Sequence, residues 1–128
     1  MSRYNPDCIF CKIAAGHIPA SVIYRNDHVL AFRDINPIAP VHVLIIPLEH
    51  IQSLSELAPG DEAIAAQILL AARTVAEKTG LLESGYRVVF NNGQDALQSV
   101  AHIHAHVIGG KTMGWPPFAG NEIVHGHA

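Results

Sequence analysis

The sequence predicts a single α+β domain, with about five strands in a sheet, one long helix and a short N-terminal helix. Five short segments carry the apolar or alternating pattern of strands, and one segment over 61–78 has the helical period. The chain has 128 residues, of which 49% are hydrophobic, and no internal linker is evident. That length is sufficient for one real core. We therefore assign 1–128 to one domain.

The N-terminal part is predicted to form a helix and then a hairpin. Asp7 is a suitable N-cap for a helix over 8–15, because its carboxylate can accept the free amide groups of the first turn. Gly16 ends that helix. Strands follow over 21–25 and 28–33, separated by a two-residue turn, and we expect them to pair.

The middle of the chain is predicted to supply a central strand and the long helix. A proline-punctuated loop over 34–40 leads to 41–46, which is apolar enough for a strand buried on both faces, with His42 as the exception. The helix over 61–78 is rich in alanine, a strong helix former, and Gly80 stops it. Its apolar side consists of Ile64, Ile68, Ala71, Ala72 and Val75.

Two further strands are predicted over 85–91 and 100–108, joined by a loop and lying antiparallel to one another. This arrangement brings Asn91 and Ser99 to opposite ends of the loop, close to the histidines that follow. The tail over 113–128 is apolar and irregular, and Trp115 beside two prolines indicates packing against another surface such as a second subunit.

Strict alternation in the last strand places His102, His104 and His106 on one face. Neighbouring imidazoles would stand about 6–7 Å apart along the strand. An unpartnered buried imidazole costs about 1–3 kcal/mol against a domain stability of about 5–15 kcal/mol, so three core histidines without a role are disfavoured. Three imidazoles on one face can bind a metal, or a phosphate with one imidazole as nucleophile.

The composition limits the partners and the compartment. The chain has 8 Lys+Arg and 11 Asp+Glu, a net charge of −3, and no basic run. We therefore expect no nucleic-acid partner, although a single nucleotide remains compatible with this surface. There is no apolar secretory core and no run of about 20 apolar residues, so we expect no membrane partner and a cytoplasmic protein. Cys8 and Cys11 are then thiols or metal ligands, because disulfides are rare in that compartment.

Taken together, these residues closely resemble the Hint branch of the histidine triad (HIT) nucleotide-binding proteins. The stretch over 102–108 fits the family pattern His-φ-His-φ-His-φ-φ, in which φ is apolar. The segments that match elsewhere, in the order of the branch, are Ile9-Phe10-Cys11-Lys12-Ile13, Ile18-Pro19-Ala20, Leu30-Ala31-Phe32, Asp34-Ile35-Asn36-Pro37, His42 with Ile46-Pro47, His50-Ile51, Gln98-Ser99-Val100 and Trp115-Pro116-Pro117.

The resemblance implies a fold, an assembly and a reaction. The fold is the HIT fold, an antiparallel sheet of about five strands with one long helix, and the assembly is a homodimer whose two sheets join. The ligands are purine nucleoside monophosphates. The reaction is hydrolysis of purine nucleoside 5′-phosphoramidates, such as adenosine phosphoramidate, or of aminoacyl adenylates.

The resemblance also implies catalytic roles. His104 is the nucleophile that attacks the α-phosphorus, with its other ring nitrogen donating to the main-chain carbonyl of His102. His106 donates to a non-bridging phosphate oxygen. Ser99 bonds the phosphate or the leaving nitrogen, and Asn91 bonds the phosphate.

The remaining nucleotide contacts implied by the resemblance are those to the sugar and the base. Asp34 accepts both ribose hydroxyls, and His42 supports the triad by hydrogen bonding. Trp115 reaches toward the site of the neighbouring subunit. The base is held by apolar side chains, which predicts weak base selectivity; the same residues would otherwise be ordinary core. They are Ile9, Phe10, Ile13, Phe32 and Ile35.

The C-x-x-C spacing of Cys8 and Cys11 can place two thiolates on one metal ion. His50 and His102 would complete a closed, structural Cys₂His₂ zinc site, an arrangement that resembles some bacterial relatives and the galactose-1-phosphate uridylyltransferases. The alternative is a pair of buried thiols that pack as small apolar groups.

Two other functional hypotheses remain open from the sequence. One is a nucleotide-binding regulator or scaffold with incidental turnover. The other is a zinc-dependent hydrolase in which His102, His104 and His106 bind a catalytic metal. Nucleotidyl transferase branches are disfavoured, because they carry Gln where this chain has His106.

Overall fold

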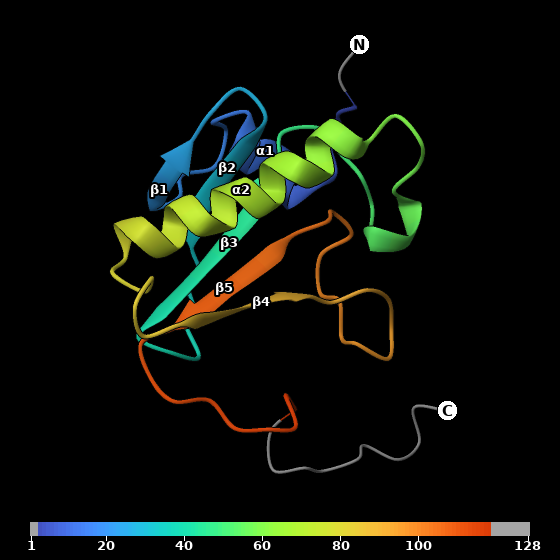
Figure 1. The fold of residues 1–128 in the computed structure, drawn as a ribbon. Helices are drawn as coiled ribbons and strands as arrows, with labels where there is room; N and C mark the ends of the chain where they lie inside the picture. The colour runs from blue at the N-terminus through green and yellow to red at the C-terminus, as the bar shows by residue number, and fades with distance from the viewer. Residues whose placement is uncertain (1–2, 119–128) are drawn as a thin grey trace.

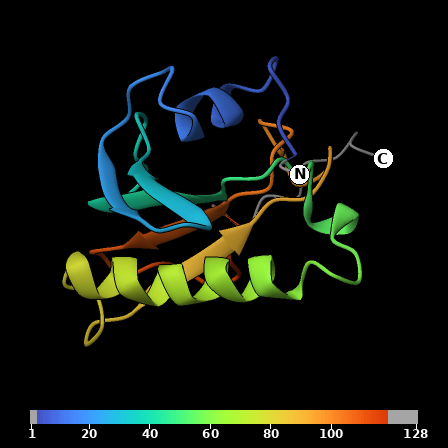
Figure 2. The ribbon, with the colours of Figure 1, turned by 90° about the horizontal axis from the view of Figure 1, so that it is seen from above.

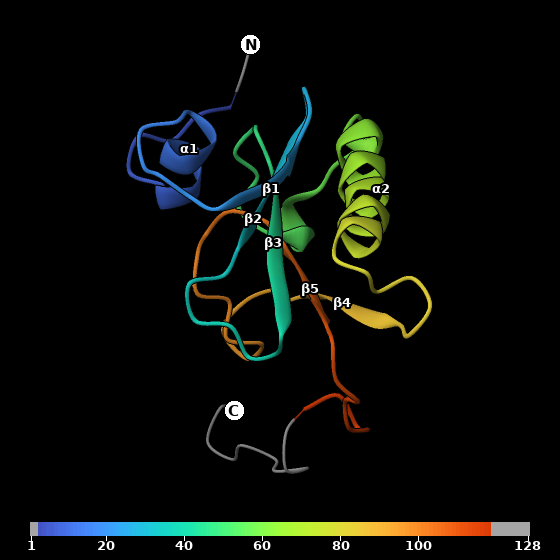
Figure 3. The same cartoon turned by 90° about the vertical axis from the view of Figure 1, so that its left-hand side faces the viewer.

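The computed structural model describes residues 3–118. Its five strands form one antiparallel sheet in the order β1-β2-β3-β5-β4 (Figure 1). Figures 2 and 3 show α1 on one face of this sheet and α2 on the other. The predicted α+β fold is confirmed. The elements are α1 (Ile9–Ala14), β1 (Val22–Arg25), β2 (Val29–Arg33), β3 (Val41–Pro47), the 3₁₀ helix η1 (Leu54–Glu56), α2 (Glu62–Lys78), β4 (Tyr86–Phe90) and β5 (Ala105–Gly109).

The central strands β2 and β3 are buried on both faces, as the apolar run over 41–46 predicts. Successive side chains of a strand point to opposite faces, so each strand serves two layers. The residues packed with α2 are Val29, Ala31, Val43 and Ile45. Those packed with α1 are Leu30, Phe32, Leu44 and Ile46.

The long helix α2 covers the face of the sheet opposite α1. Its predicted apolar side is confirmed, since Ile68, Ala71, Ala72 and Val75 are all buried. The small side chains of the buried residues Ala71, Ala72 and Ala76 let the helix lie close to the sheet. Asp61 is the N-cap residue, but its carboxylate accepts from the Ala58 amide and the Arg3 guanidinium.

The last strand is shorter than predicted. Instead of 100–108, only Ala105–Gly109 pairs with its neighbours. Upstream of Ala105, the amide of Ile103 donates to the carbonyl of Ile51 at 2.6 Å, outside the sheet. Since β4 ends at Phe90, opposite Ala105, no strand lies beside the earlier residues on that side. The alternation of side chains continues past the end of the ladder, and it alone could not reveal where pairing stops.

Smaller boundaries also differ from the prediction. The N-cap of α1 is Cys8, whose Sγ accepts the Cys11 amide at 3.3 Å, while the amide of Asp7 donates to Asn5. The predicted strand at 28–33 starts one residue later, because Asn26 accepts the amides of residues 28 and 29 in a turn. The helix η1 was not predicted.

The described tail residues 113–118 contain no helix or strand, as expected; the rest of the predicted irregular tail, 119–128, lies outside the described residues. Within residues 3–118, no helix has both the length and the apolar character needed to cross a membrane.

Candidate active site and metal centre

The ring direction of His104 is set by the chain that carries it. His104 is buried, and its Nδ1 lies 2.8 Å from the main-chain oxygen of His102. A carbonyl only accepts, so Nδ1 carries the ring hydrogen. Burial lowers the pKa of His104, against the raising effects of this hydrogen bond and of Asp34. The ring is therefore neutral near pH 7, with the lone pair on Nε2.

The opposite tautomer is imposed on His106 by His42. The main-chain amide of Ile38 donates to His42 Nδ1 at 3.2 Å, which leaves the hydrogen of His42 on Nε2. That atom lies 2.9 Å from Nδ1 of His106, so the hydrogen of His106 is on Nε2. Asp34 Oδ2 is a longer alternative acceptor, 3.4 Å from His42 Nε2.

The Nε2–H of His106 has no hydrogen-bond acceptor in the part of the chain that the structure describes. Among residues 3–118 it is the one buried side-chain nitrogen or oxygen without a hydrogen-bond partner. Burial, followed by the neighbouring His104 and His42, lowers the pKa of His106 to about 4, so the ring is neutral near pH 7. An unsatisfied buried donor of this kind points to a ligand that supplies the acceptor.

The ring of His102 has a third environment. It is fully buried, and its Nε2 donates to the main-chain oxygen of Pro47 at 2.9 Å. The lone pair on Nδ1 therefore faces the sulfur atoms of Cys8 and Cys11, at 3.3 and 3.5 Å. His50 Nδ1 lies 3.4 Å from Cys11 Sγ. Desolvation lowers the pKa of His102 to about 4.

These four residues fit a zinc ion. Their ligand atoms all lie within 4.8 Å of one another. A tetrahedron with Zn–S of about 2.3 Å and Zn–N of about 2.0–2.1 Å has S···N edges of about 3.5 Å, which matches the three sulfur–nitrogen distances of 3.3, 3.4 and 3.5 Å. Main-chain amides of Cys11 and Asn5 also donate to the two sulfurs, the outer contacts that support thiolate ligands.

The triad nitrogens themselves do not form a common metal cluster in the described part of the chain. His102 groups with the cysteines, His106 groups with Asp34 and His42, and His104 belongs to neither group. Three identical side chains thus have three different surroundings. The rings of His104 and His106 are neighbours, with centroids 5.0 Å apart.

The other predicted nucleotide contacts are only partly assembled. Asp34 is positioned by its own turn, with Oδ1 accepting the Asn36 amide at 2.8 Å. Asn91 follows Phe90, the last residue of β4, and is half-buried; Ser99 is exposed. Within residues 3–118, no hydrogen bond joins either side chain to the triad.

The predicted base-binding residues divide into a packed pair and an exposed rim. Phe10 and Phe32 are buried and meet edge to face with centroids 5.6 Å apart. Phe10 also meets the ring of His104 edge-on at 5.1 Å. Ile9 and Ile35 are 48% and 91% exposed, while Ile13 is partly buried against the α1 cluster. Exposed apolar side chains beside a buried aromatic pair are suited to an apolar ligand group.

A family model described as the HIT domain matches residues 15–113. The chain belongs to the HIT domain family.

Individual relatives of this HIT domain agree with that assignment. The 14 kDa zinc-binding protein of Zea mays is 50% identical, over 85% of this chain and 86% of the relative. An uncharacterised HIT-like protein of Synechocystis sp. is 45% identical, over 87% of this chain and 96% of the relative. The crystal structure of a HIT family hydrolase from Legionella pneumophila has 48% identity and a TM-score of 0.86, covering 88% of this chain and all of that one.

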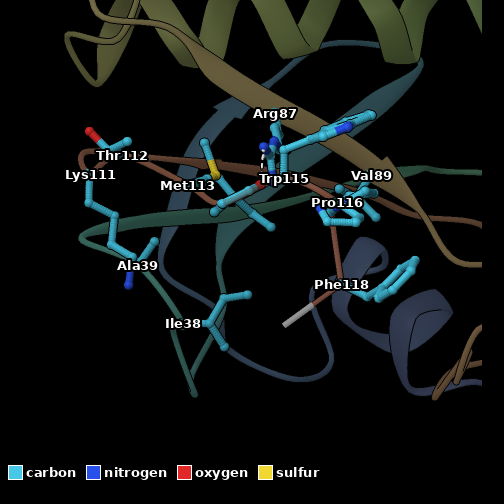
Figure 4. Close-up of a pocket in the computed structure, with 13 residues that line it drawn as sticks. Ile38, Ala39, Arg87, Val89, Lys111, Thr112, Met113, Trp115, Pro116 and Phe118 are labelled. Atoms are coloured by element: carbon cyan, nitrogen blue, oxygen red, sulfur yellow. Dashed lines mark hydrogen bonds between the residues drawn. The ribbon is translucent and has the colours of Figure 1, made fainter. Parts of the chain in front are cut away.

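Trp115 of this HIT domain lies beside β4. It is 81% exposed, and the guanidinium of Arg87 is 5.9 Å from its ring centre. Arg87 also donates to the main-chain oxygen of Gly114. Figure 4 shows these side chains around a cavity of about 660 Å³, which is lined by the tail together with residues of β4, β5 and the 34–40 loop.

Sequence reasoning missed the groups that orient the HIT histidines. The carbonyl of Pro47 and the amide of Ile38 are main-chain atoms, which no side-chain pattern reveals. Gln98 was treated only as part of a matching segment. Its amide donates to the carbonyls of Gln52 and Val100 and its oxygen accepts the Gly93 amide, so it organises the loop before the triad. The position of Gln98 between the Asn92-Gly93 turn and the histidines is the feature of the sequence that could have indicated this role.

Proposed function

We propose that this HIT protein is a nucleotide hydrolase of the Hint type. It converts purine nucleoside 5′-phosphoramidates or aminoacyl adenylates into nucleoside monophosphates through a covalent nucleotidyl-histidine. The observation that carries the proposal is the opposite placement of ring hydrogens on two adjacent imidazoles. His104 offers an unprotonated Nε2, and His106 offers an Nε2–H without an acceptor. A nucleophile and a donor for developing charge are what such a transfer requires.

The first step breaks the bond between phosphorus and the leaving group. Nε2 of His104 attacks the α-phosphorus as the bond from phosphorus to the leaving group breaks; a leaving amine takes up a proton from solvent water, whereas the carboxylate of an aminoacyl adenylate departs without one. His106 donates its Nε2–H to a non-bridging oxygen as charge grows there. In the second step, water attacks phosphorus and the bond from phosphorus to Nε2 of His104 breaks. The water releases one proton to solvent, and Nε2 regains its lone pair. The neutral state of both rings, which burial favours, supports this sequence.

The contacts to the rest of the nucleotide follow the same proposal. Ser99 and Asn91 bind the phosphate, with Ser99 also able to reach the leaving nitrogen. Asp34 accepts both ribose hydroxyls, for which its carboxylate retains free lone pairs beside the Asn36 hydrogen bond. The base lies against the apolar residues Ile9, Phe10, Ile13, Phe32 and Ile35. His42 acts through His106 and does not touch the nucleotide.

Zinc is the proposed structural ion. Cys8, Cys11, His50 and His102 would hold it, and the ion would supply a fixed crosslink between α1 and the segment before the nucleophile. The donor set and its edge lengths support this assignment. The name of the maize relative, a zinc-binding protein, also supports it.

A homodimer is the proposed assembly. Strand β4 lies at the edge of the sheet, and a strand edge is a template for pairing with another chain. Trp115 and Phe118 beside it are 81% and 54% exposed, which is unusual for such side chains outside an interface. Light scattering during size-exclusion chromatography tests this: a mass of one chain at micromolar concentration contradicts it.

The decisive experiment is to quench a reaction with a labelled nucleoside phosphoramidate and locate the label by mass spectrometry. We expect one nucleotidyl group on His104, absent from His104→Ala and present in His17→Ala, whose histidine is exposed on the α1 side. Adenosine monophosphate binding without any cleavage by the native protein would instead support a regulator. Zinc-restored activity with no adduct would support a metal-dependent hydrolase.

A further inference from the structure

The candidate metal centre and the candidate nucleophile share one residue. His102 directs Nδ1 toward the two sulfurs, while its main-chain oxygen accepts the Nδ1–H of His104 at 2.8 Å. The ring and the carbonyl are attached to the same Cα. Any force that fixes the ring of His102 therefore also fixes the direction of the acceptor that orients His104.

This part of the backbone lacks the support of strand pairing. β5 starts at Ala105, so residues 102–104 lie beyond the ladder. They are held by the Ile103 amide on Ile51 and by the ring of His102 on Pro47. The position of the His102 carbonyl consequently depends on one main-chain hydrogen bond and on the contacts of the His102 ring, which include those to the sulfurs of Cys8 and Cys11.

A second connection runs through α1. Phe10 lies between Cys8 and Cys11, and its ring meets those of His102 and His104 edge-on, with centroids 5.9 and 5.1 Å apart. A helix of six residues does not hold its position by itself. Fixing the two cysteines therefore fixes the ring that packs on His104.

Hydrogen bonds can satisfy this cluster in more than one way, because the thiols of Cys8 and Cys11 both lie within hydrogen-bond distance of His102 Nδ1. Cys11 Sγ is close to Nδ1 of both His50 and His102, yet its single thiol hydrogen can serve only one of them. Alternative hydrogen-bonding arrangements are therefore available to the metal-free protein. A tetrahedral ion bonds all four ligands at once and leaves one arrangement.

We propose that filling the Cys8–Cys11–His50–His102 cluster with Zn²⁺ positions His104 for attack, with His102 as the positioning residue that transmits the effect through its carbonyl. The inference rests on the proposed function only for what His104 attacks. It predicts that the metal-free protein remains folded and binds nucleotide, but has lost the single tautomer and direction of the His104 ring.

The test compares metal-free and Zn²⁺-loaded wild-type protein, His50→Ala, and His17→Ala as the matched control. Two-bond ¹H–¹⁵N correlation spectra report which nitrogen of His104 carries the hydrogen. We expect a pure Nδ1–H pattern for loaded wild type and control, and an averaged pattern for metal-free wild type and for His50→Ala with Zn²⁺. Methyl signals of Ile68 and Val75, on the α2 side, report general unfolding and should not move.

Kinetics supply the second readout. Transfer of the nucleotidyl group to His104 should slow roughly 10- to 100-fold without the ion, the range for lost outer contacts and small misplacements, while the Kd for adenosine monophosphate changes much less. A His104 pattern that is the same with and without Zn²⁺ overturns the proposal, whatever the rate. If His50→Ala does not fold, the zinc titration of wild type decides alone.

The two proposals fail separately in this experiment. A zinc-dependent His104 pattern with no nucleotidyl adduct in any sample rejects the proposed hydrolase and keeps the coupling. An adduct that forms equally fast with and without Zn²⁺ keeps the hydrolase and rejects the coupling.

Discussion

Replacing His42 by leucine should disturb both the stability of the protein and the tautomer of His106. The change removes two hydrogen bonds, from the Ile38 amide to Nδ1 and from Nε2 to His106 Nδ1. The His106 nitrogen is then left buried without a donor, which costs about 1–3 kcal/mol. We expect the free energy of unfolding, from urea titrations, to fall by about that amount.

The hydrogen bond from His42 Nε2 to His106 Nδ1 also determines the tautomer of His106. It favours the Nε2–H form of His106 by about 1–3 kcal/mol, and at about 1.4 kcal/mol for each factor of ten this is a bias of roughly 5- to 150-fold. In His42→Leu the bias is lost, so ¹⁵N spectra should show His106 as a mixture of tautomers, and turnover should fall more than nucleotide binding does.

The matched control is His28→Leu, at an exposed histidine, where a change within about 0.5 kcal/mol is expected. If His106 in His42→Leu keeps a pure Nε2–H pattern, or if wild-type His106 carries its hydrogen on Nδ1, the relay from Ile38 through His42 is refuted.

Three further outcomes are expected. Because burial holds the pKa of His106 at about 4 instead of 6.5, the unfolded chain binds a proton that the native protein does not. Through His106 alone, the free energy of unfolding of metal-free protein should therefore drop by about 2–3 kcal/mol as pH falls from about 6.5 to 4, in addition to the drop caused by His102, whose pKa is also lowered to about 4. In His106→Gln that slope, measured by urea titration at several pH values, should be shallower. Cys11→Ser should bind less zinc by metal analysis and lose most zinc-dependent increase in Tm; equal increases would contradict the cluster. Ile45→Ala, at a fully buried site, should cost about 2–5 kcal/mol with kcat unchanged, whereas Leu69→Ala at the exposed side of α2 should be nearly neutral.

The spacing of apolar residues predicted the sheet and the long helix, because a buried face requires apolar side chains at the period of the element that carries it. The apolar run over 41–46 and the helical repeat over 61–78 each correspond to an observed element within a residue or two. The predicted start of the histidine strand was wrong, since pairing with β3 and β4 begins only at Ala105 while the alternation in the sequence begins earlier. The N-cap was wrong because the sulfur of Cys8, in place of the carboxylate of Asp7, accepts the Cys11 amide.

The residues that form the site were easier to predict from the sequence than their arrangement. The sequence and its resemblance pointed to residues that the structure brings together around His102 and His104, including the Cys8–Cys11–His50–His102 cluster. The resemblance implied that His104 donates to the carbonyl of His102, but the groups that orient the rings of His102 and His42 could not be predicted, because Pro47 and Ile38 contribute main-chain atoms. The cytoplasmic location and the lack of a nucleic-acid partner stay predictions.

The acceptors for the rings of His102 and His104 are peptide oxygens, those of Pro47 and His102. Every amino acid has such an oxygen, so no single codon change can delete either acceptor. Substitutions at the exposed residues Ile9 and Ile35 can therefore change the surface beside the site while the main-chain acceptor of His104 remains in the sequence. Redirecting the His104 ring therefore requires a change in the path of the main chain at these oxygens or in the contacts that hold that path.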